Sequence, residues 1–106
     1  MTQGDIVLVQ FPFSNLAEKK LRPALVLSNA RYNRHFNVLL AGIYSKEKPL
    51  SVPITHADVQ RKRLVKASYI SLQNLFSIEK TLVRHTIDAL TKQKLAEVLA
   101  EAACCL

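Results

Sequence analysis

Short apolar runs, each ended by polar or basic residues, constrain the fold of this chain more than any other feature. Asp5–Phe11, Pro23–Ser28 and Phe36–Tyr44 are rich in β-branched and aliphatic residues, which favours strands. The third run is apolar at consecutive positions, which predicts a strand buried on both faces. Gly42 interrupts this run and predicts a bulge or a close backbone approach. All of these runs are far shorter than the ~20 residues of a membrane-spanning helix.

Three further strands are expected in the second half of the chain. They are Leu50–Ile54, Lys66–Leu72 and Thr81–Asp88. Pro53 lacks an N–H for a central ladder, so it restricts the first of them to an edge or a bulge. The basic stretch between the first two, residues 55–65, is expected to form a loop or the end of a hairpin.

The C-terminal segment has a helical period instead. From Thr91 onward, apolar residues recur on one face at Leu95, Val98, Leu99, Ala102 and Leu106. Thr91 is a suitable N-cap, because its hydroxyl accepts a backbone N–H of the first turn. The pattern predicts a single domain over residues 1–106. It is mainly β and antiparallel, with a small, strongly bent sheet or barrel and one packed helix.

The charge balance points to an acidic partner. The 106 residues contain 15 Lys and Arg against 8 Asp and Glu, which gives a net charge of +7. Such a domain favours nucleic acid or an acidic protein as its partner, although net charge also serves solubility. The opening residues lack the pattern of a signal peptide. The adjacent Cys104 and Cys105 are expected to pack as small apolar residues in a reducing cytosol.

Known cofactor and metal motifs are missing from the sequence. His35, His56 and His85 are isolated and lack metal-ligand spacing. No phosphate-binding glycine loop and no nucleophile elbow occurs. We therefore expect no metal and no cofactor.

Cationic residues are concentrated in the expected loops. The candidates for binding a polyanion are Lys19, Lys20, Arg31, Arg34, Lys46, Arg61 and Arg63. Tyr32, His35 and Phe36 alternate with the two arginines of the 29–35 loop, a combination that suits single-stranded nucleic acid. Ordinary solvated loops are the alternative.

Arg22 differs from these residues because Pro23 follows it directly at the start of a buried strand. Its backbone is restrained, so its guanidinium emerges at a fixed place. A preorganised cation beside a phosphate stabilises the extra charge of a pentacovalent transition state. The alternative is a surface salt bridge to Glu18 or Asp5, which contributes ~0–1 kcal/mol.

Two segments in this order resemble the N-terminal signature of the PemK/MazF toxins of bacterial toxin–antitoxin systems. They are Gly4–Phe13 (GDIVLVQFPF) and Arg22–Ser28 (RPALVLS). Val38–Tyr44 is similar to the third strand of this family, and Tyr69–Lys80 is similar to a later segment. The C-terminal helix also matches, so the resemblance covers nearly the whole chain.

The resemblance implies an SH3-like barrel that forms a homodimer and cleaves single-stranded RNA without a metal. The ribose 2′-OH would attack the adjacent phosphate and leave a 2′,3′-cyclic phosphate and a 5′-OH. An acidic antitoxin would cover the basic groove, and the toxin–antitoxin complex would bind DNA.

The same resemblance assigns roles to individual residues. The catalytic arginine of the family falls on Arg22, and its catalytic threonine falls on Tyr44, followed by Ser45. A further polar residue of the family falls on Asn74, with Gln73 beside it. On a regular strand Tyr44 and Ser45 point to opposite faces, which favours Tyr44 as the source of the hydroxyl.

Two alternatives to a ribonuclease remain. One is a non-catalytic basic module of the same fold that binds an antitoxin and DNA, or another protein. The departure from threonine at Tyr44 favours this alternative. The other is a toxin of this fold that acts on a protein such as gyrase, in which Arg22 would have no special role.

Overall fold

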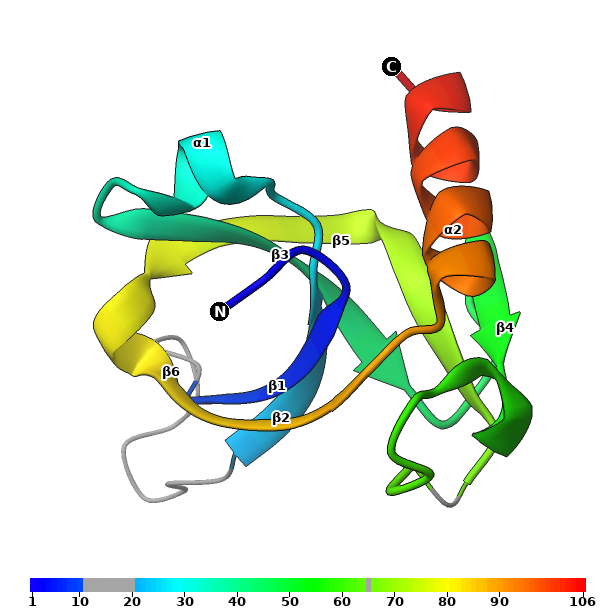
Figure 1. The fold of residues 1–106 in the computed structure, drawn as a ribbon. Helices are drawn as coiled ribbons and strands as arrows, with labels where there is room; N and C mark the ends of the chain where they lie inside the picture. Colours follow the sequence, from blue (N-terminus) through cyan, green and yellow to red (C-terminus); the bar gives the residue numbers. More distant parts are fainter. Residues whose placement is uncertain (11–20, 65) are drawn as a thin grey trace.

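Six antiparallel strands form one curled sheet, in the order β4-β5-β3-β2-β1-β6 (Figure 1). The computed structural model describes residues 1–10, 21–64 and 66–106. The strands are β1 (Asp5–Gln10), β2 (Leu21–Val26), β3 (Asn37–Tyr44), β4 (Ser51–Ile54), β5 (Ser68–Glu79) and β6 (Val83–Ala89). The helices are α1 (Ala30–Asn33) and α2 (Lys92–Cys104), and two short 3-10 turns cover His56–Asp58 and Lys80–Leu82. The expected mainly β fold with a C-terminal helix is confirmed.

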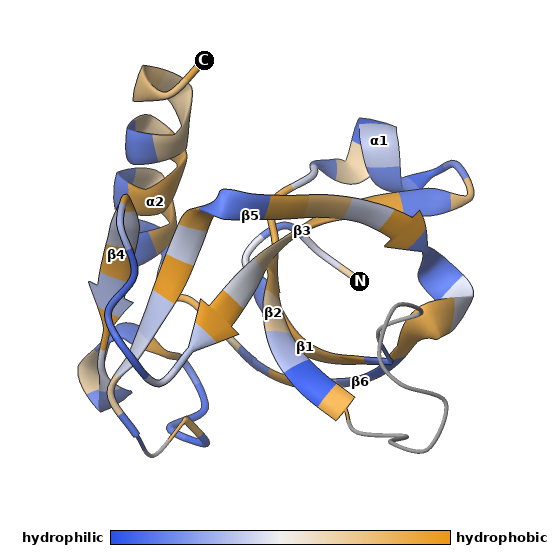
Figure 2. Cartoon of the chain, turned by 180° about the vertical axis from the view of Figure 1, so that it is seen from behind, coloured by the Kyte–Doolittle hydropathy of each residue, from blue (hydrophilic) through white to orange (hydrophobic). Residues whose placement is uncertain are grey.

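Strands β1, β2 and β3 are buried on both faces, so neighbouring residues enter different hydrophobic clusters. Ile6 and Leu25 lie in a cluster that also contains Val98 of α2. Val7 and Val26, which follow them in the sequence, lie in a second cluster inside the curl of the sheet. Figure 2 shows hydrophobic residues along the central strands and hydrophilic residues on the connecting segments. The prediction of double burial for the third strand is confirmed for its central residues, Val38 to Ile43, but Phe36 lies before the strand and is exposed.

The sheet curls without closing, because β4 and β6 remain its two edges. Pro53 lies in β4, as expected for a strand at an edge. The register of β3 against β5 shifts between Ala41 and Ile43, so the irregularity expected at Gly42 is confirmed.

Strand β5 bends where it changes its partner on β3. Between the pairs Ala41–Leu75 and Ile43–Ile70, the single residue Gly42 of β3 lies opposite four residues of β5, 71–74. The extra residues form a large bulge that includes Asn74, whose backbone N–H donates to the Ser71 hydroxyl at 3.2 Å. The sequence predicts that this strand ends at Leu72, but it continues past the bulge to Glu79.

The C-terminal helix begins as expected and packs against the N-terminal turn. The Thr91 hydroxyl accepts the N–H of Lys94 at 3.3 Å. Gly4 has a φ of +95°, and a Cβ at this position would lie 2.9 Å from Cδ2 of Leu95. Only glycine combines that backbone angle with so close a helix. Gly4 thereby joins the end of β2 to α2, since its N–H donates to the Val26 carbonyl at 2.8 Å.

Three local expectations are wrong. The 29–35 segment contains the short helix α1, capped by the Asn29 side chain, where a loop was expected. Cys104 and Cys105 are exposed, because the end of α2 extends past the sheet and leaves no core there to receive them. Leu106 follows the helix and is also exposed. Within the described residues, no helix is long and apolar enough to cross a membrane.

Asp88 is fully buried and organises the basic segment that precedes β5. Its carboxylate accepts backbone N–H groups from Arg61 and Arg63, both at 2.8 Å, from Leu64 at 3.3 Å and from Ala89 at 2.9 Å. Burial by itself raises the pKa of Asp88, but the four N–H donors outweigh it and hold the pKa below its usual value. The carboxylate therefore fixes the segment that carries two of the candidate RNA-binding arginines.

We predict that Asp88→Asn destabilises the fold and that the loss depends on pH. The amide group turns one acceptor into a donor, which costs about 1–3 kcal/mol for each N–H left unpaired. Since the folded-state pKa is lowered, the ionised carboxylate stabilises the protein above about pH 4, and this contribution falls as acid protonates it. Urea unfolding should show a large difference between the two proteins at pH 7 and a smaller one at pH 3. Asp58→Asn, at an exposed capping box, is the control. Equal losses in the two variants would contradict the assignment.

Candidate active site

Arg22 and Tyr44 lie side by side at the open end of the curled sheet. The ladder between β2 and β3 pairs Ala24 with Gly42, and continuing this register by two residues brings Arg22 opposite Tyr44. Both residues line one small open hollow of about 40 Å³, together with Pro23, Gly42 and Ile43. The structure therefore brings together two of the three residues expected to be catalytic.

Gly42 makes room for the ring of Tyr44. The two residues are two positions apart on β3, and a Cβ on Gly42 would lie 2.8 Å from the Tyr44 hydroxyl oxygen. The absence of a side chain at Gly42 thus allows the ring to fold back along the strand. The close approach predicted at Gly42 is therefore the contact of its backbone with the Tyr44 ring.

Two further side chains hold Tyr44 from the other directions. The side-chain amide of Asn74 donates a hydrogen bond to the Tyr44 hydroxyl oxygen. The ammonium group of Lys48 lies 4.9 Å from the centre of the ring, a cation–π distance. Because the hydroxyl oxygen accepts from Asn74, its own hydrogen is free to be donated to another acceptor. The sequence alone indicates no definite role for Asn74 and does not single out Lys48. Asn74 comes to the end of β3 only because of the bulge in β5.

The alternative source of a hydroxyl, Ser45, does not line this hollow. It follows the last residue of β3 and is exposed. The chemistry that the site offers is therefore a fixed phenol beside a guanidinium.

Arg22 is exposed, and its charge is not neutralised by an ion pair to any carboxylate that the structure describes. One of the two expected partners, Asp5, accepts the N–H of Thr2 at 2.9 Å instead. The other, Glu18, lies outside the described residues. The guanidinium can thus receive an anion from solvent.

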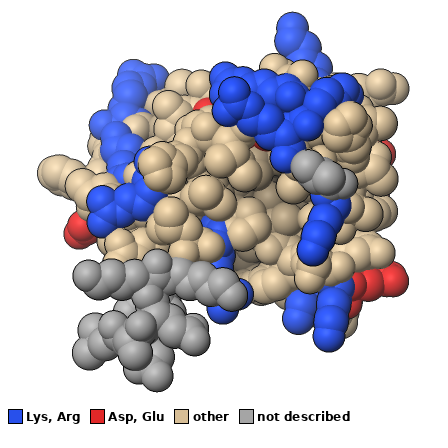
Figure 3. Space-filling view, turned by 90° about the horizontal axis from the view of Figure 1, so that it is seen from below, with Lys and Arg blue, Asp and Glu red and all other residues tan. Residues whose placement is uncertain are grey.

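The other predicted cations are spread over several segments. Lys46 is exposed just beyond β3, and Arg61 and Arg63 are exposed on the segment fixed by Asp88. Arg31 and Arg34 are exposed on and after α1, at the opposite end of β3 from Tyr44. Lys19 and Lys20 lie outside the described residues. Figure 3 shows Lys and Arg side chains at several points around a hollowed, uncharged surface, with few acidic groups.

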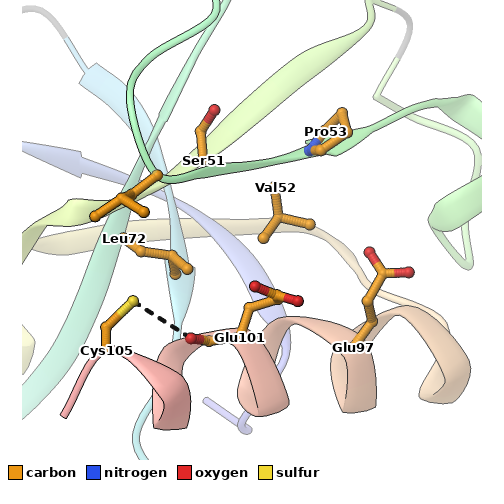
Figure 4. A pocket seen from close by; sticks show the side chains of 8 residues that line it. Ser51, Val52, Pro53, Leu72, Glu97, Glu101 and Cys105 are labelled. Atoms are coloured by element: carbon orange, nitrogen blue, oxygen red, sulfur yellow. Dashed lines mark hydrogen bonds between the residues drawn. The ribbon is translucent and has the colours of Figure 1, made fainter.

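A second, larger hollow between β4 and α2 has a different character. It measures about 330 Å³ and is lined by Leu50, Ser51, Val52, Pro53, Leu72, Glu97, Glu101 and Cys105. Figure 4 shows the Glu97 and Glu101 side chains reaching from α2 toward β4. Two carboxylates on an apolar lining repel a polyanion, so this hollow is a poor candidate for the site.

The described parts of the chain contain no group of three His, Cys, Asp or Glu side chains placed to hold a metal ion. Among the residues that the structure describes, the polar side-chain groups that we find at the hollow beside Arg22 are the Arg22 guanidinium, the Tyr44 phenol with the Asn74 amide bonded to it, and the Lys48 ammonium over the ring.

Comparisons with solved structures show that the fold is shared with known proteins. A Mycobacterium tuberculosis toxin, MazF-mt6, is 24% identical, with a TM-score of 0.69 over 92% of this chain and 90% of that one. A MazE–MazF crystal structure from Deinococcus radiodurans is 23% identical, with a TM-score of 0.75 over 99% and 94%. An endoribonuclease in complex with its cognate antitoxin, from a mycobacterial species, is 17% identical, with a TM-score of 0.75 over 98% and 90%.

A comparison of the sequence with protein families identifies the family. Residues 2–104 match the profile of a family described as the PemK-like, MazF-like toxin of type II toxin–antitoxin systems. The match covers β1 to the end of α2 and includes both residues of the Arg22–Tyr44 hollow. The chain therefore belongs to the PemK-like, MazF-like toxins of type II toxin–antitoxin systems.

Proposed function

We propose that this toxin cleaves single-stranded RNA in the cytosol, with Arg22 and Tyr44 as its catalytic residues. The observation that carries this proposal is the placement of an unneutralised guanidinium and an oriented phenol in one open hollow. Family membership and the endoribonuclease in the structural comparison support it.

In the proposed reaction the ribose 2′-OH gives up its proton to solvent water and attacks the adjacent phosphorus, and the bond from phosphorus to the 5′ oxygen breaks. The products are a 2′,3′-cyclic phosphate and a 5′-OH. The guanidinium of Arg22 stabilises the additional negative charge of the phosphorane. The phenol of Tyr44 donates its free hydrogen to the leaving 5′ oxygen, while Asn74 occupies a lone pair of the same hydroxyl. A second proton returns from solvent to the phenolate of Tyr44 after the leaving oxygen has been protonated.

The partner of this toxin is proposed to be an acidic antitoxin that covers the basic surface. The net charge of +7 supports an acidic partner. The similar structures described as complexes with MazE or a cognate antitoxin support a protein partner. A homodimer, and binding of DNA by the toxin–antitoxin complex, remain proposals from the family resemblance.

A specific observation favours the second candidate function, a non-catalytic module of the same fold. The family's threonine is replaced by Tyr44, whose ring fills much of the space over Gly42. If the protein cleaves no RNA but its Tyr44→Thr variant does, the protein is a catalytically inactive member that acts by binding.

We expect Arg22→Ala to lower RNA cleavage by about 10²–10³-fold while the fold survives. Arg22 is exposed on β2, so its removal has little effect on stability. Arg22→Lys should restore only part of the activity, because an ammonium lacks the planar fork of a guanidinium. The measurement is the rate of end formation on a labelled RNA, with thermal unfolding as the control. Full activity of the Ala variant would remove Arg22 from the mechanism.

Tyr44→Phe keeps the ring and removes only the hydroxyl, so it should slow cleavage by roughly 10²-fold. Ser45→Ala is the matched control, because it removes a neighbouring hydroxyl that lies outside the hollow. The expected effect of this control is close to none. The reverse pattern would transfer the catalytic role to Ser45.

Gly42→Ala tests whether the position of the phenol matters as well as its presence. The new methyl group would approach the Tyr44 hydroxyl oxygen to 2.8 Å, so the ring must move. A displacement of about 1 Å at a reacting group lowers the rate by up to about 10²-fold. We expect this loss in the otherwise unaltered protein and little additional loss in Tyr44→Phe. Additive losses in the double variant would show that Gly42 acts by another route.

A further inference from the structure

The corner between α1 and β3 presents the most exposed aromatic side chain that the structure describes. Phe36 is 88% exposed, and Tyr32 is 41% exposed beside it. Together with His35 and Asn37 they line an open hollow of about 410 Å³. An apolar ring so far out of the core is unfavourable in water unless something covers it.

Hydrogen bonds hold the backbone of this corner and the ring of Tyr32 in place. The backbone carbonyl of Phe36 accepts the N–H of Lys80 at 2.9 Å. The ammonium of Lys80 donates to the Asn33 carbonyl at 2.6 Å, at the end of α1. The hydroxyls of Tyr32 and Ser77 share a hydrogen bond of 2.9 Å. The Tyr32 ring is thus fixed to β5 and the backbone of Phe36 to the turn that follows β5, which reduces the entropy lost when a ligand binds.

The charges around the hollow favour an anionic ligand. Arg31 and Arg34 are exposed, and each directly precedes in the sequence a residue that lines the hollow, Tyr32 and His35. Glu79 is the acidic residue facing this corner, since it pairs with Asn37 across the ladder from β3 to β5. The cations of the corner, including Lys80, therefore outnumber this carboxylate.

We propose that the α1–β3 corner is an accessory RNA site that stacks one unpaired base on Phe36. Arg31 and Arg34 neutralise the phosphates on either side of that base. Aromatic rings next to guanidinium groups are the combination with which proteins hold single-stranded nucleic acid. A purely apolar docking surface for a protein would not need the two arginines.

The accessory site is separate from the catalytic hollow. The eight residues of β3 lie between them, which at about 3.3 Å per residue is about 25 Å. The corner therefore contacts nucleotides away from the cleaved bond and affects binding of long RNAs. This inference rests on the proposed RNA substrate but not on cleavage.

The test measures binding of a fluorescent, fully 2′-O-methylated RNA of 16 nucleotides, which lacks the attacking hydroxyl and stays intact. We expect Phe36→Leu to weaken binding roughly tenfold, because it keeps an apolar side chain and loses the ring. Phe36→Tyr should retain the affinity. The double change Arg31→Ala and Arg34→Ala should flatten the plot of log affinity against log salt by about 1.4, or about 0.7 for each phosphate contact.

Either of two other outcomes would contradict the proposal of an accessory site. Equal affinity of the Leu, Tyr and unaltered proteins would exclude stacking at Phe36. Unchanged RNA affinity with weakened antitoxin binding in Phe36→Leu would assign the corner to a protein partner. Unaltered thermal unfolding is the control for folding, as expected for so exposed a ring. Cleavage of unmodified RNA is assayed separately, so loss of stacking and lack of nuclease activity give different results.

Discussion

The burial of β1, β2 and β3 on both faces is the constraint on which the rest of this molecule depends. Adjacent residues of β1 and β2 alternate between the cluster under α2 and the cluster inside the curl. Because both faces of these strands are buried, polar functional side chains can reach solvent only near the strand ends. Arg22 and Tyr44 lie at such ends, next to each other, because β2 and β3 are antiparallel neighbours. The curl of the sheet then leaves the two side chains open to solvent.

The two glycines of the chain each allow a close contact that a side chain would prevent. Gly4 adopts a positive φ and lies against Leu95 of α2, which attaches the C-terminal helix to the first strand. Gly42 gives space to Tyr44 beside Arg22. One glycine therefore serves the packing of the fold and the other serves the geometry of the site. The bulge of β5 completes that geometry, because it places Asn74 against the hydroxyl.

Tertiary contacts hold the backbone of several basic segments in fixed positions. A fully buried carboxylate, Asp88, fixes the segment that carries Arg61 and Arg63 through backbone N–H groups. Arg31 and Arg34 flank the aromatic corner at the far end of β3. Two carboxylates on α2 face the hollow beside β4 and give that side a different character. The distribution favours RNA contacts at the two ends of β3 and disfavours them beside α2.

The sequence by itself determined most of the secondary-structure elements and indicated which residues to expect at the site. Apolar periodicity identified six strands and the C-terminal helix, Pro53 indicated an edge, and the Arg22–Pro23 pair marked a fixed cation. These features are local, so a single segment carries each of them. Tertiary structure alone decided that Asn74 reaches Tyr44 and that Asp88 holds a distant loop. Those contacts join residues 24 to 30 positions apart. Strand register and the β5 bulge set them, and no local sequence pattern encodes either.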